Sequence, residues 1–537
     1  MHLFILIVLI ACSLAAAPAS QPASVPLKVE QWGRFEVALP GPREGNPFLD
    51  VELSATFTWN EIARTVRGFY DGDGVYRIRF MPPAVGVWRF VTRSNRAELN
   101  GRAGELTVTA PSPGNHGPVR VAGRYHFAYA DGTAFVPIGT TCYAWVHQPE
   151  ALEQRTLATL KASPFNKVRM CVFPTAYKKG GDEPPRFPFE RSADGAFDHA
   201  RFNVAFFRHL EQRIAQLGEL GVEADVILFH PYDKGTMGFD RMPAGDDDRY
   251  VHYLVARLSA YRNVWWSMAN EFDLMHEKHD VDFDRLFQIL QADDPADHLR
   301  SIHFSARMYD SSKPWITHLS VQNGAAVDDF GRASLYRDVA GKPVIYDEAR
   351  YEGNIERRWG QLSAEQMVEH CWLGTIGGTF VGHGEVLRDQ SGESWTSRGG
   401  ELRGQSAARI AFLKSILTEA PPVSPIDRFY ETHVGGRAGE FYLVYFGSER
   451  PAEWAFQLPR IGLEEGMTFR VDVLDTWNMT STPVEGPAVR LVKQGMYAFA
   501  AEGERKIALP GRPWMALRIV RVGAAPTTAV APVNEAE

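Results

Sequence analysis

The segment NVWWSMANEFD (263–273) carries an apolar run directly into an Asn-Glu pair. Strands of a parallel α/β sheet are buried on both faces, so they read as continuous apolar runs. In a (β/α)₈ barrel the catalytic groups stand at the carboxyl ends of such strands. We therefore predict a buried strand over Val264–Met268, with Asn270 and Glu271 at its end and facing a cavity.

Seven further apolar runs resemble this one, and helix-like stretches separate them. The helix-like stretches include 202–221 and 249–261, and the carboxylates Asp246 to Asp248 before the second suit a helix N-terminus. Eight strand–helix units between residues 118 and 421 predict a central (β/α)₈ TIM barrel. The other seven predicted strands are 134–142, 166–173, 223–230, 299–304, 315–322, 342–348 and 377–383.

The flanks of this region have a different pattern. Residues 25–111 and 425–523 alternate apolar and polar side chains in short runs separated by turn signals, which predicts a β-sandwich on each side of the barrel. PSPGNHGP (111–118) is typical of a linker, and residues 524–537 of a flexible tail. The predicted fold class is therefore multidomain, with a central barrel between two β-sandwiches.

The first 19 residues have the pattern of an export signal: an apolar stretch from Leu3 to Leu14 precedes small residues. The stretch is short for a membrane span. Cys12 lies where a bacterial lipoprotein signal would place a lipidated cysteine, so a lipid anchor is an alternative. We expect an exported protein that is periplasmic, secreted or an outer-surface lipoprotein.

Charge and cysteine content exclude several classes of function. The net charge is −8 without a basic block, which argues against a nucleic-acid partner. Apart from Cys12 there are three cysteines, too few for a disulfide framework and without the spacing of a zinc site. No metal or other cofactor is expected, and the sequence does not indicate an oligomeric state.

A second predicted strand also ends in a carboxylate, because KPVIYDE (342–348) finishes at Glu348. Glycoside hydrolysis requires two carboxyl groups on one cavity. One must hold a proton for the leaving oxygen, and the other must be ionised near the anomeric carbon. Glu271 and Glu348 are therefore the candidate catalytic residues, and a carbohydrate is the expected substrate.

Polar and aromatic residues gather at the other strand ends, where they could bind a sugar. Some have a structural alternative: His303 could be a core histidine, and Arg169 could serve only as an ion-pair partner. Glu352 and Glu385 suggest supporting or rim positions, and Tyr232 is a further aromatic residue of this kind. The candidate substrate-binding residues are Asn270, Arg169, His230, His303, Gln322, His383, Tyr143, Trp145, Tyr351 and Trp395.

These motifs resemble the large clan of retaining (β/α)₈-barrel glycoside hydrolases. The segments 303–324, DEARYEG (347–353) and GGTFVGHGE (377–385) are similar to glycoside hydrolases of bacterial polysaccharide-degrading systems that carry β-sandwiches at both ends. One relative of that kind is an apiosidase acting on pectin side chains. The resemblance covers most of the chain after the signal.

The resemblance to the clan implies a role for each matching residue. Glu271 would be the acid/base and Glu348 the nucleophile of a double displacement with retention. Asn270 would contact the sugar 2-hydroxyl, and Arg169 would keep Glu348 ionised. Two other readings stay open at this point: an inverting hydrolase or transglycosidase on the same barrel, and a non-catalytic carbohydrate-binding surface protein.

Overall fold

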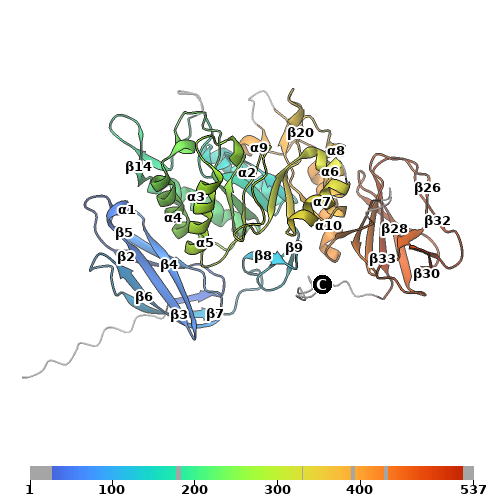
Figure 1. Cartoon of the computed structure of the whole chain (residues 1–537), viewed down its shortest axis with the longest axis horizontal. Coiled ribbons are helices and arrows are strands. Elements are labelled where there is room, and N and C mark those ends of the chain that lie inside the picture. Colours follow the sequence, from blue (N-terminus) through green and yellow to red (C-terminus); the bar gives the residue numbers. More distant parts are fainter. Residues whose placement is uncertain (1–26, 177–182, 329, 389–393, 428–432, 524–537) are drawn as a thin grey trace, which may run out of the picture.

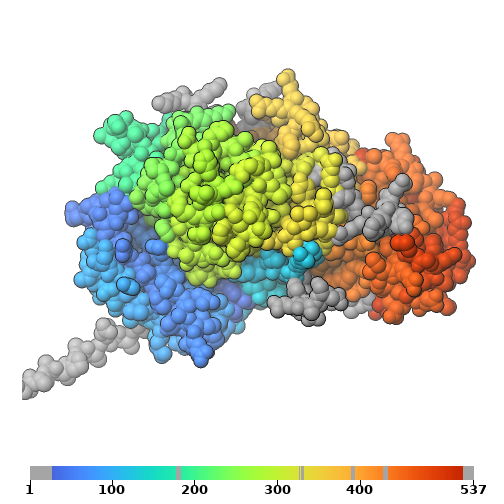
Figure 2. Space-filling model, viewed as in Figure 1, coloured from blue at the N-terminus to red at the C-terminus, as the bar shows by residue number. Residues whose placement is uncertain are grey.

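The structure is a computed structural model that describes residues 27–176, 183–328, 330–388, 394–427 and 433–523. The predicted export signal with Cys12 and the predicted tail lie outside these residues. The chain is multidomain: a central α/β domain lies between an N-terminal and a C-terminal β domain (Figure 1). Figure 2 shows the N-terminal domain packed beneath the central one, and the C-terminal domain at its right-hand end.

The N-terminal domain has seven strands, paired in the order β1-β7-β6-β3-β4-β5-β2. The first part of β4 pairs with β3 and its last three residues pair with β5, so this strand passes from one group of strands to the other. Aromatic rings fill the space between the groups, with Phe57 stacked on Phe80 at 4.2 Å. The elements are β1 (Leu27–Glu30), β2 (Phe35–Pro40), α1 (Pro47–Asp50), β3 (Leu53–Trp59), β4 (Ile62–Tyr70), β5 (Val75–Phe80), β6 (Gly86–Ser94) and β7 (Ala103–Thr109).

The predicted strand 134–142 is wrong as a single element. Its beginning is β10 (Ala134–Phe135), which joins a small sheet with β8 (Val119–Ala122) and β9 (His126–Tyr129), and its end is β11 (Gly139–Thr141). Val136, Pro137 and Ile138 lie between the two strands. An apolar run alone does not reveal such a break, because both halves are buried or half-buried.

The central domain continues with alternating strands and helices. Between them lie short 3-10 turns and a hairpin, β13–β14, that the sequence did not predict. Its strands are β12 (Lys167–Cys171), β13 (Phe189–Arg191), β14 (Phe197–Phe202), β15 (Glu223–Phe229), β16 (Val264–Ala269), β17 (Arg300–Ser301), β18 (Leu319–Gln322), β19 (Val344–Glu348), β20 (Glu352–Gly353), β21 (Phe380–Val381) and β22 (Glu385–Val386). Its helices are α2 (Glu150–Ala162), α3 (Val204–Glu219), α4 (Ala244–Leu258), α5 (Asp280–Asp293), α6 (Gly324–Asp328), α7 (Phe330–Ala340), α8 (Ala364–Ile376), α9 (Trp395–Arg398) and α10 (Ser406–Glu419).

Eight of these strands form a ring of parallel pairings. The order β11-β12-β15-β16-β17 makes one sheet and β18-β19-β21 makes another. Two single parallel bridges connect their edges: His303 pairs with Ser320, and His383 pairs with Thr140. Carboxyl ends of parallel strands meet on one face, so Glu271 and Glu348 leave the ring on the same side.

Capping residues and the spacing of apolar residues explain where the helices of this domain begin and which side they bury. Asn203 caps α3 by accepting hydrogen bonds from the amides of Ala205 and Phe206. The helix then buries apolar residues at spacings of three and four. The predicted helix 249–261 begins earlier than expected, so Asp246 and Asp247 lie in the first turn of α4 instead of before it. Their charge still suits that end of the helix.

The two tryptophans of the opening segment point to opposite sides of β16. Trp265 packs against Phe127 at 5.3 Å and belongs to the cluster between the ring and the small sheet β8–β10. Trp266 donates its Nε1 hydrogen to Asp294 Oδ2 at 2.9 Å on the helix side. The apolar run is therefore a strand buried on both faces, as predicted.

The C-terminal domain is a second β domain. Its main sheet has the order β23-β24-β25-β33-β28-β30-β31-β27, β29 pairs with β28, and β26 pairs with β32. The elements are β23 (Ser424–Asp427), β24 (His433–Arg437), β25 (Phe441–Tyr445), β26 (Glu453–Ala455), β27 (Gln457–Pro459), β28 (Thr468–Asp475), β29 (Thr480–Pro483), β30 (Val489–Gln494), β31 (Tyr497–Ala500), β32 (Lys506–Ala508) and β33 (Met515–Arg521).

Both β domains pack tightly on the central domain. Asp71 of the N-terminal domain accepts hydrogen bonds from Arg208 of α3 and from Arg257 of α4. On the other side, Trp372 of α8 stacks on Tyr445 of β25 at 5.4 Å. No helix in the described ranges has the length and apolar character that crossing a membrane requires.

Candidate active site

Glu271 and Glu348 stand at the carboxyl ends of β16 and β19, which β17 and β18 separate in the ring. Glu348 is the last residue of β19 and is only 5% exposed. Glu271 follows β16 by two residues, is partly exposed, and has a left-handed backbone with φ of 46°. A non-glycine residue in this region carries strain of the kind that clusters at functional sites.

A chain of hydrogen bonds connects the two glutamates. Tyr232 donates its hydroxyl hydrogen to Glu271 Oε2 at 2.9 Å, and the amide of Asn270 donates to the Tyr232 hydroxyl. The same amide lies 3.5 Å from Glu348 Oε1, which also accepts the hydroxyl hydrogen of Tyr143. The two carboxyl groups therefore belong to one site.

Arg169, in the middle of β12, contacts both Asn270 and Glu348. Its Nη2 donates to Asn270 Oδ1 at 2.5 Å, which fixes the amide with its nitrogen toward the glutamates. Its Nη1 lies 3.9 Å from Glu348 Oε1. Burial would lower the pKa of Arg169, but Asp347 and other nearby acidic groups hold it well above its usual value. A permanent positive charge therefore faces Glu348.

A layer of buried charged side chains, made of Lys167, Asp225 and Asp347, lies next to Arg169. Lys167 Nζ is 2.6 Å from Asp225 Oδ2 and 2.8 Å from Asp347 Oδ1. Burial raises the pKa of Asp347, but Lys167 and Arg169 outweigh it and hold the pKa well below its ordinary value. Asp347 precedes Glu348 in β19, so this layer fixes the strand that presents the glutamate.

Replacing Lys167 with Met should destabilise the protein by about 3–5 kcal/mol, because two buried carboxylates would lose their shared cation. Urea unfolding would measure the change. Lys161→Met, at an exposed position on α2, is the matched control and should stay within about 0.5 kcal/mol of the parent. Equal stability of the two variants would show that the layer contributes nothing.

The environment of Glu271 favours its protonated form. Burial is the largest cause of its raised pKa, and the negative charge of Glu348 adds to it. Hydrogen bonds from Tyr232 and Gln322 act in the opposite direction. Glu271 is therefore suited to hold a proton at a pH where an ordinary glutamate is ionised.

The structure brings four more predicted residues around Glu348. His303 Nε2 lies 3.9 Å from Glu348 Oε1, and burial lowers the pKa of this histidine, so the ring is neutral. Gln322 is paired with Glu348 in the register of β18 and β19. Burial, followed by the charge of Glu348, raises the pKa of the Tyr351 phenol. Tyr143 bonds to Glu348 directly, as described above.

His230 is connected to Glu271 through Tyr232. Its Nε2 is 2.9 Å from the carbonyl oxygen of Phe173, and its Nδ1 accepts the backbone hydrogen of Tyr232 at 3.1 Å. Its ring also stacks on that of Tyr232 at 5.1 Å. His230 therefore positions Tyr232, and both ring nitrogens already have partners.

Three other predicted binding residues are not at the glutamates. Trp145 and Trp395 are 0% and 1% exposed, so neither indole presents a face to a ligand in this structure. His383 is buried against Phe165, with ring centroids 4.8 Å apart, and its Nδ1 lies 3.1 Å from Thr140 Oγ1. Aromatic character predicted a sugar contact, but packing of the outer layer explains these positions.

Sequence reasoning gave too little weight to some residues that shape the site. Tyr232 was one aromatic residue among several, although it contacts Glu271 directly. Lys167, Asp225 and Asp347 were not singled out. A usable signal was present, because charged residues inside otherwise apolar strands must find buried partners.

Metal-binding side chains do not accompany the two glutamates. Among the described residues, the groups able to hold an ion are Glu150, Glu153 and His209 in one place, and Glu352, His383 and Glu385 in another.

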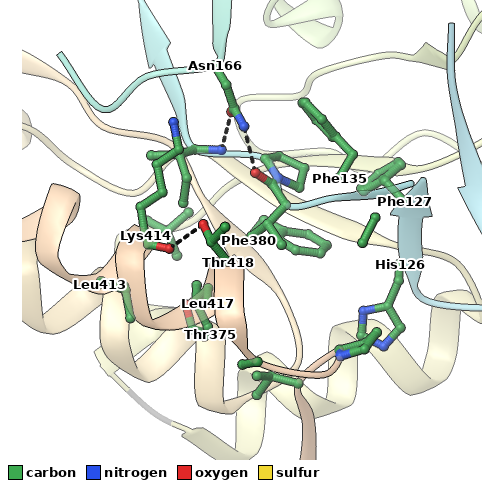
Figure 3. Close-up of a pocket in the computed structure, with 18 of the residues that line it drawn as sticks. His126, Phe127, Phe135, Asn166, Thr375, Phe380, Leu413, Lys414, Leu417 and Thr418 are labelled. Carbon is green, nitrogen blue, oxygen red and sulfur yellow. Dashed lines mark hydrogen bonds between the residues drawn. The ribbon is translucent and has the colours of Figure 1, made fainter. Parts of the chain in front are cut away.

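An apolar cavity of about 270 Å³ lies at the opposite ends of the strands. Figure 3 shows Phe127, Phe135 and Phe380 on one side of it, and Lys414 and Thr418 on the other. Burial lowers the pKa of its histidine, His126, to about 4. No carboxylate lines this cavity, so it lacks the acid pair that the other end of the ring provides.

Comparison with known proteins matches every domain. Residues 121–421 match the family model described as "Apiosidase-like, catalytic domain". Residues 28–95 and 430–520 match two domains of unknown function, DUF5060 and DUF5605. No curated protein matches the chain.

Two solved structures from Bacteroides vulgatus are similar to the chain. One, assigned provisionally as a glycoside hydrolase, is 41% identical to this chain, with a TM-score of 0.88. The match covers 92% of this chain and 100% of the Bacteroides chain. The other, a family 5 glycoside hydrolase, is 14% identical, with 79% and 98% coverage and a TM-score of 0.57, and so shares the fold. The family model of the catalytic domain matches more than half of this chain, and the chain therefore belongs to the apiosidase-like family.

Proposed function

We propose that the protein is a glycoside hydrolase whose central domain is a (β/α)₈ barrel, and that it acts by a retaining double displacement. The observation that carries this proposal is the hydrogen-bond chain joining Glu271 to Glu348 through Tyr232 and Asn270. The closed ring of parallel pairings supports the barrel. The family description and the provisional assignment of the similar Bacteroides protein support the reaction class.

In the first step, a Glu348 oxygen forms a bond to the anomeric carbon while the bond to the leaving oxygen breaks. Glu271 gives its proton to that oxygen. In the second step, water transfers a proton to Glu271 and its oxygen bonds to the anomeric carbon. As that bond forms, the bond between the anomeric carbon and the Glu348 oxygen breaks, and both glutamates return to their starting states.

The contacts of Glu348 suggest which oxygen attacks. The contacts from Tyr143, Asn270, Arg169 and His303 described above all reach Oε1. Oε2 is therefore the oxygen that we assign to the nucleophilic role. The positive charge of Arg169 and the donor hydrogens therefore face the other oxygen, Oε1.

A panel of aryl glycosides tests the reaction, with apiosides included because of the family description. The anomeric configuration of the first product, followed by proton NMR, tests the stereochemistry. Retention supports double displacement, whereas inversion would replace it with single displacement by water. Transfer of the sugar to added alcohol would indicate a transglycosidase, and binding without turnover of any substrate would indicate a carbohydrate-binding protein.

Replacing Tyr232 with Phe should move the alkaline limb of the kcat/KM profile to higher pH. The hydroxyl of Tyr232 stabilises the ionised form of Glu271 and so lowers the pKa of that residue. Without it the pKa of Glu271 rises, and the acid keeps its proton to higher pH. A profile that does not move, or that moves to lower pH, would contradict this assignment.

The remaining predictions from the sequence become proposals about the whole chain. We propose export through residues 1–19, with Cys12 as the alternative lipid-anchor site. We also propose domain limits at 25–111, 118–421 and 425–523, which the three family matches support. A carbohydrate is the proposed partner of the central domain.

A further inference from the structure

Three buried titratable side chains gather outside the ring of strands. Glu352 of β20 and Glu385 of β22 face each other in a parallel pair, and His383 precedes β22 by two residues. One ligand atom from each lies within 4.8 Å of the other two. The three residues are 5%, 1% and 1% exposed, so Glu385 is not on the rim that the sequence suggested.

The two carboxylates are held in place by backbone donors. Glu385 accepts hydrogen bonds from the amides of Arg403 and Gly404, both at 2.8 Å. Glu352 accepts from the amide of Gln405 at 2.9 Å, and from the amide and hydroxyl of Ser406 at 3.2 and 2.5 Å. Each carboxylate still has acceptor capacity for a further partner.

Side-chain cations differ between this cluster and the other acidic cluster of the described residues. No Lys or Arg within the described ranges forms a salt bridge with Glu352 or Glu385, and Arg403 acts on Glu385 only as a weaker, more distant charge. The other acidic cluster differs, because Arg213 lies 2.5 Å from Glu150 and 2.6 Å from Glu153. Its negative charge is therefore already balanced by a guanidinium.

His383 has a ring nitrogen to offer. Its Nδ1 lies next to the hydroxyl of Thr140, whereas Nε2 is buried without a hydrogen-bond partner. A neutral imidazole binds a metal through a ring nitrogen that has no other partner, and Nε2 is such a nitrogen here. Thr140 provides the outer hydrogen bond that usually orients a histidine ligand.

We propose that Glu352, Glu385 and Nε2 of His383 bind one divalent transition-metal ion of the Zn²⁺ or Mn²⁺ class. An imidazole together with two carboxylates suits these ions better than Ca²⁺, which prefers oxygen ligands alone. Three ligand atoms bound to one such ion lie about 3.3–3.6 Å from one another, so any pair of them near the 4.8 Å limit would close by roughly 1–1.5 Å on binding.

The ion would have a structural role. It would join the segment after β19 to the segment after β21, next to the start of α10. Tyr351 precedes Glu352 and faces Glu348, so the ion would stabilise one wall of the candidate active site. The competing arrangement is a single proton shared by Glu352 and Glu385.

Metal titration of the full, tag-free chain tests this proposal. After dialysis against a chelator, the protein is titrated with ZnCl₂ or MnCl₂ and monitored by calorimetry, metal analysis and thermal unfolding. We expect one ion per chain and a rise in Tm of at least about 3 °C at saturation. Absence of saturable binding for both ions would overturn the proposal and favour the shared proton.

Variants separate this site from other places where an ion could bind. His383→Gln should lose the stoichiometric ion and its effect on Tm, whereas His209→Gln, in the cluster balanced by Arg213, should keep both. Binding that persists in His383→Gln would refute the site. If Glu385→Gln does not fold, the parent chain and the two histidine variants still decide the question.

Discussion

Replacing Glu348 with Gln should reduce kcat for glycoside hydrolysis by about 10⁴-fold or more, while the protein stays folded. The amide keeps the size of the carboxyl group and its place beside Tyr143, Asn270 and Arg169. It cannot form the ester to the anomeric carbon on which double displacement depends. Turnover of an aryl glycoside with a good leaving group measures the loss, because departure of such a group needs little help from the acid.

The control for this variant lies in the segment after β20. Glu356 is exposed and follows the same strand, so Glu356→Gln should retain the activity of the parent. Circular dichroism and Tm of both variants check folding. Activity in Glu348→Gln within tenfold of the parent would remove the nucleophile assignment.

A shortened side chain tests the geometry of the attack. In Glu348→Ala, azide can enter the space of the missing carboxylate and attack the anomeric carbon from that side. The expected product is a glycosyl azide of the opposite configuration to the substrate. An azide product of retained configuration would place the nucleophile elsewhere.

The strand ends could be predicted from the sequence because a parallel strand buried on both faces has a simple signature. Apolar runs that end near Glu271 and at Glu348 predicted that both side chains lie at the carboxyl ends of strands, on one face of the ring. Charge inside a strand was equally visible at Lys167 and Asp225, but its meaning depends on which strands are neighbours. Only the ring of pairings shows that these residues and Asp347 meet.

Boundaries and exposure were harder to predict. Residues 134–142 look like one strand because the short segment between β10 and β11 is no more polar than its flanks. Trp145 and Trp395 have the type of side chain that often binds sugars, but both are buried by the packing of surrounding helices and loops. Residue type indicates what a side chain can do, whereas its accessibility depends on elements distant in the sequence.

Loop conformation was also beyond the sequence. Tyr232 reaches Glu271 because His230 accepts its backbone hydrogen and stacks on its ring. Glu271 has a left-handed backbone without being glycine, aspartate or asparagine, the residues that usually signal this conformation. Neither feature leaves a local pattern that could be read in advance.

Replacing Glu271 with Ala should give a loss that depends on the leaving group, which is the signature of a general acid. For a poor leaving group such as an alkyl or sugar oxygen, kcat/KM should fall by about 10²–10⁴-fold, because the oxygen departs without a proton. For a nitrophenyl group, whose phenolate is stable unprotonated, the first step should be nearly unchanged. Parallel measurements with a series of aryl glycosides show the difference.

Azide then distinguishes Glu271 from Glu348. In Glu271→Ala the ester with Glu348 forms normally but accumulates, because no base activates water. Azide needs no base, so it should accelerate turnover and give a glycosyl azide of the same configuration as the substrate. Equal losses for all leaving groups, or an azide of inverted configuration, would contradict the role of Glu271. Opposite azide products from the two alanine variants would require carboxyl groups on opposite faces of one sugar, and the hydrogen bonds through Asn270 and Tyr232 already place both groups in one site.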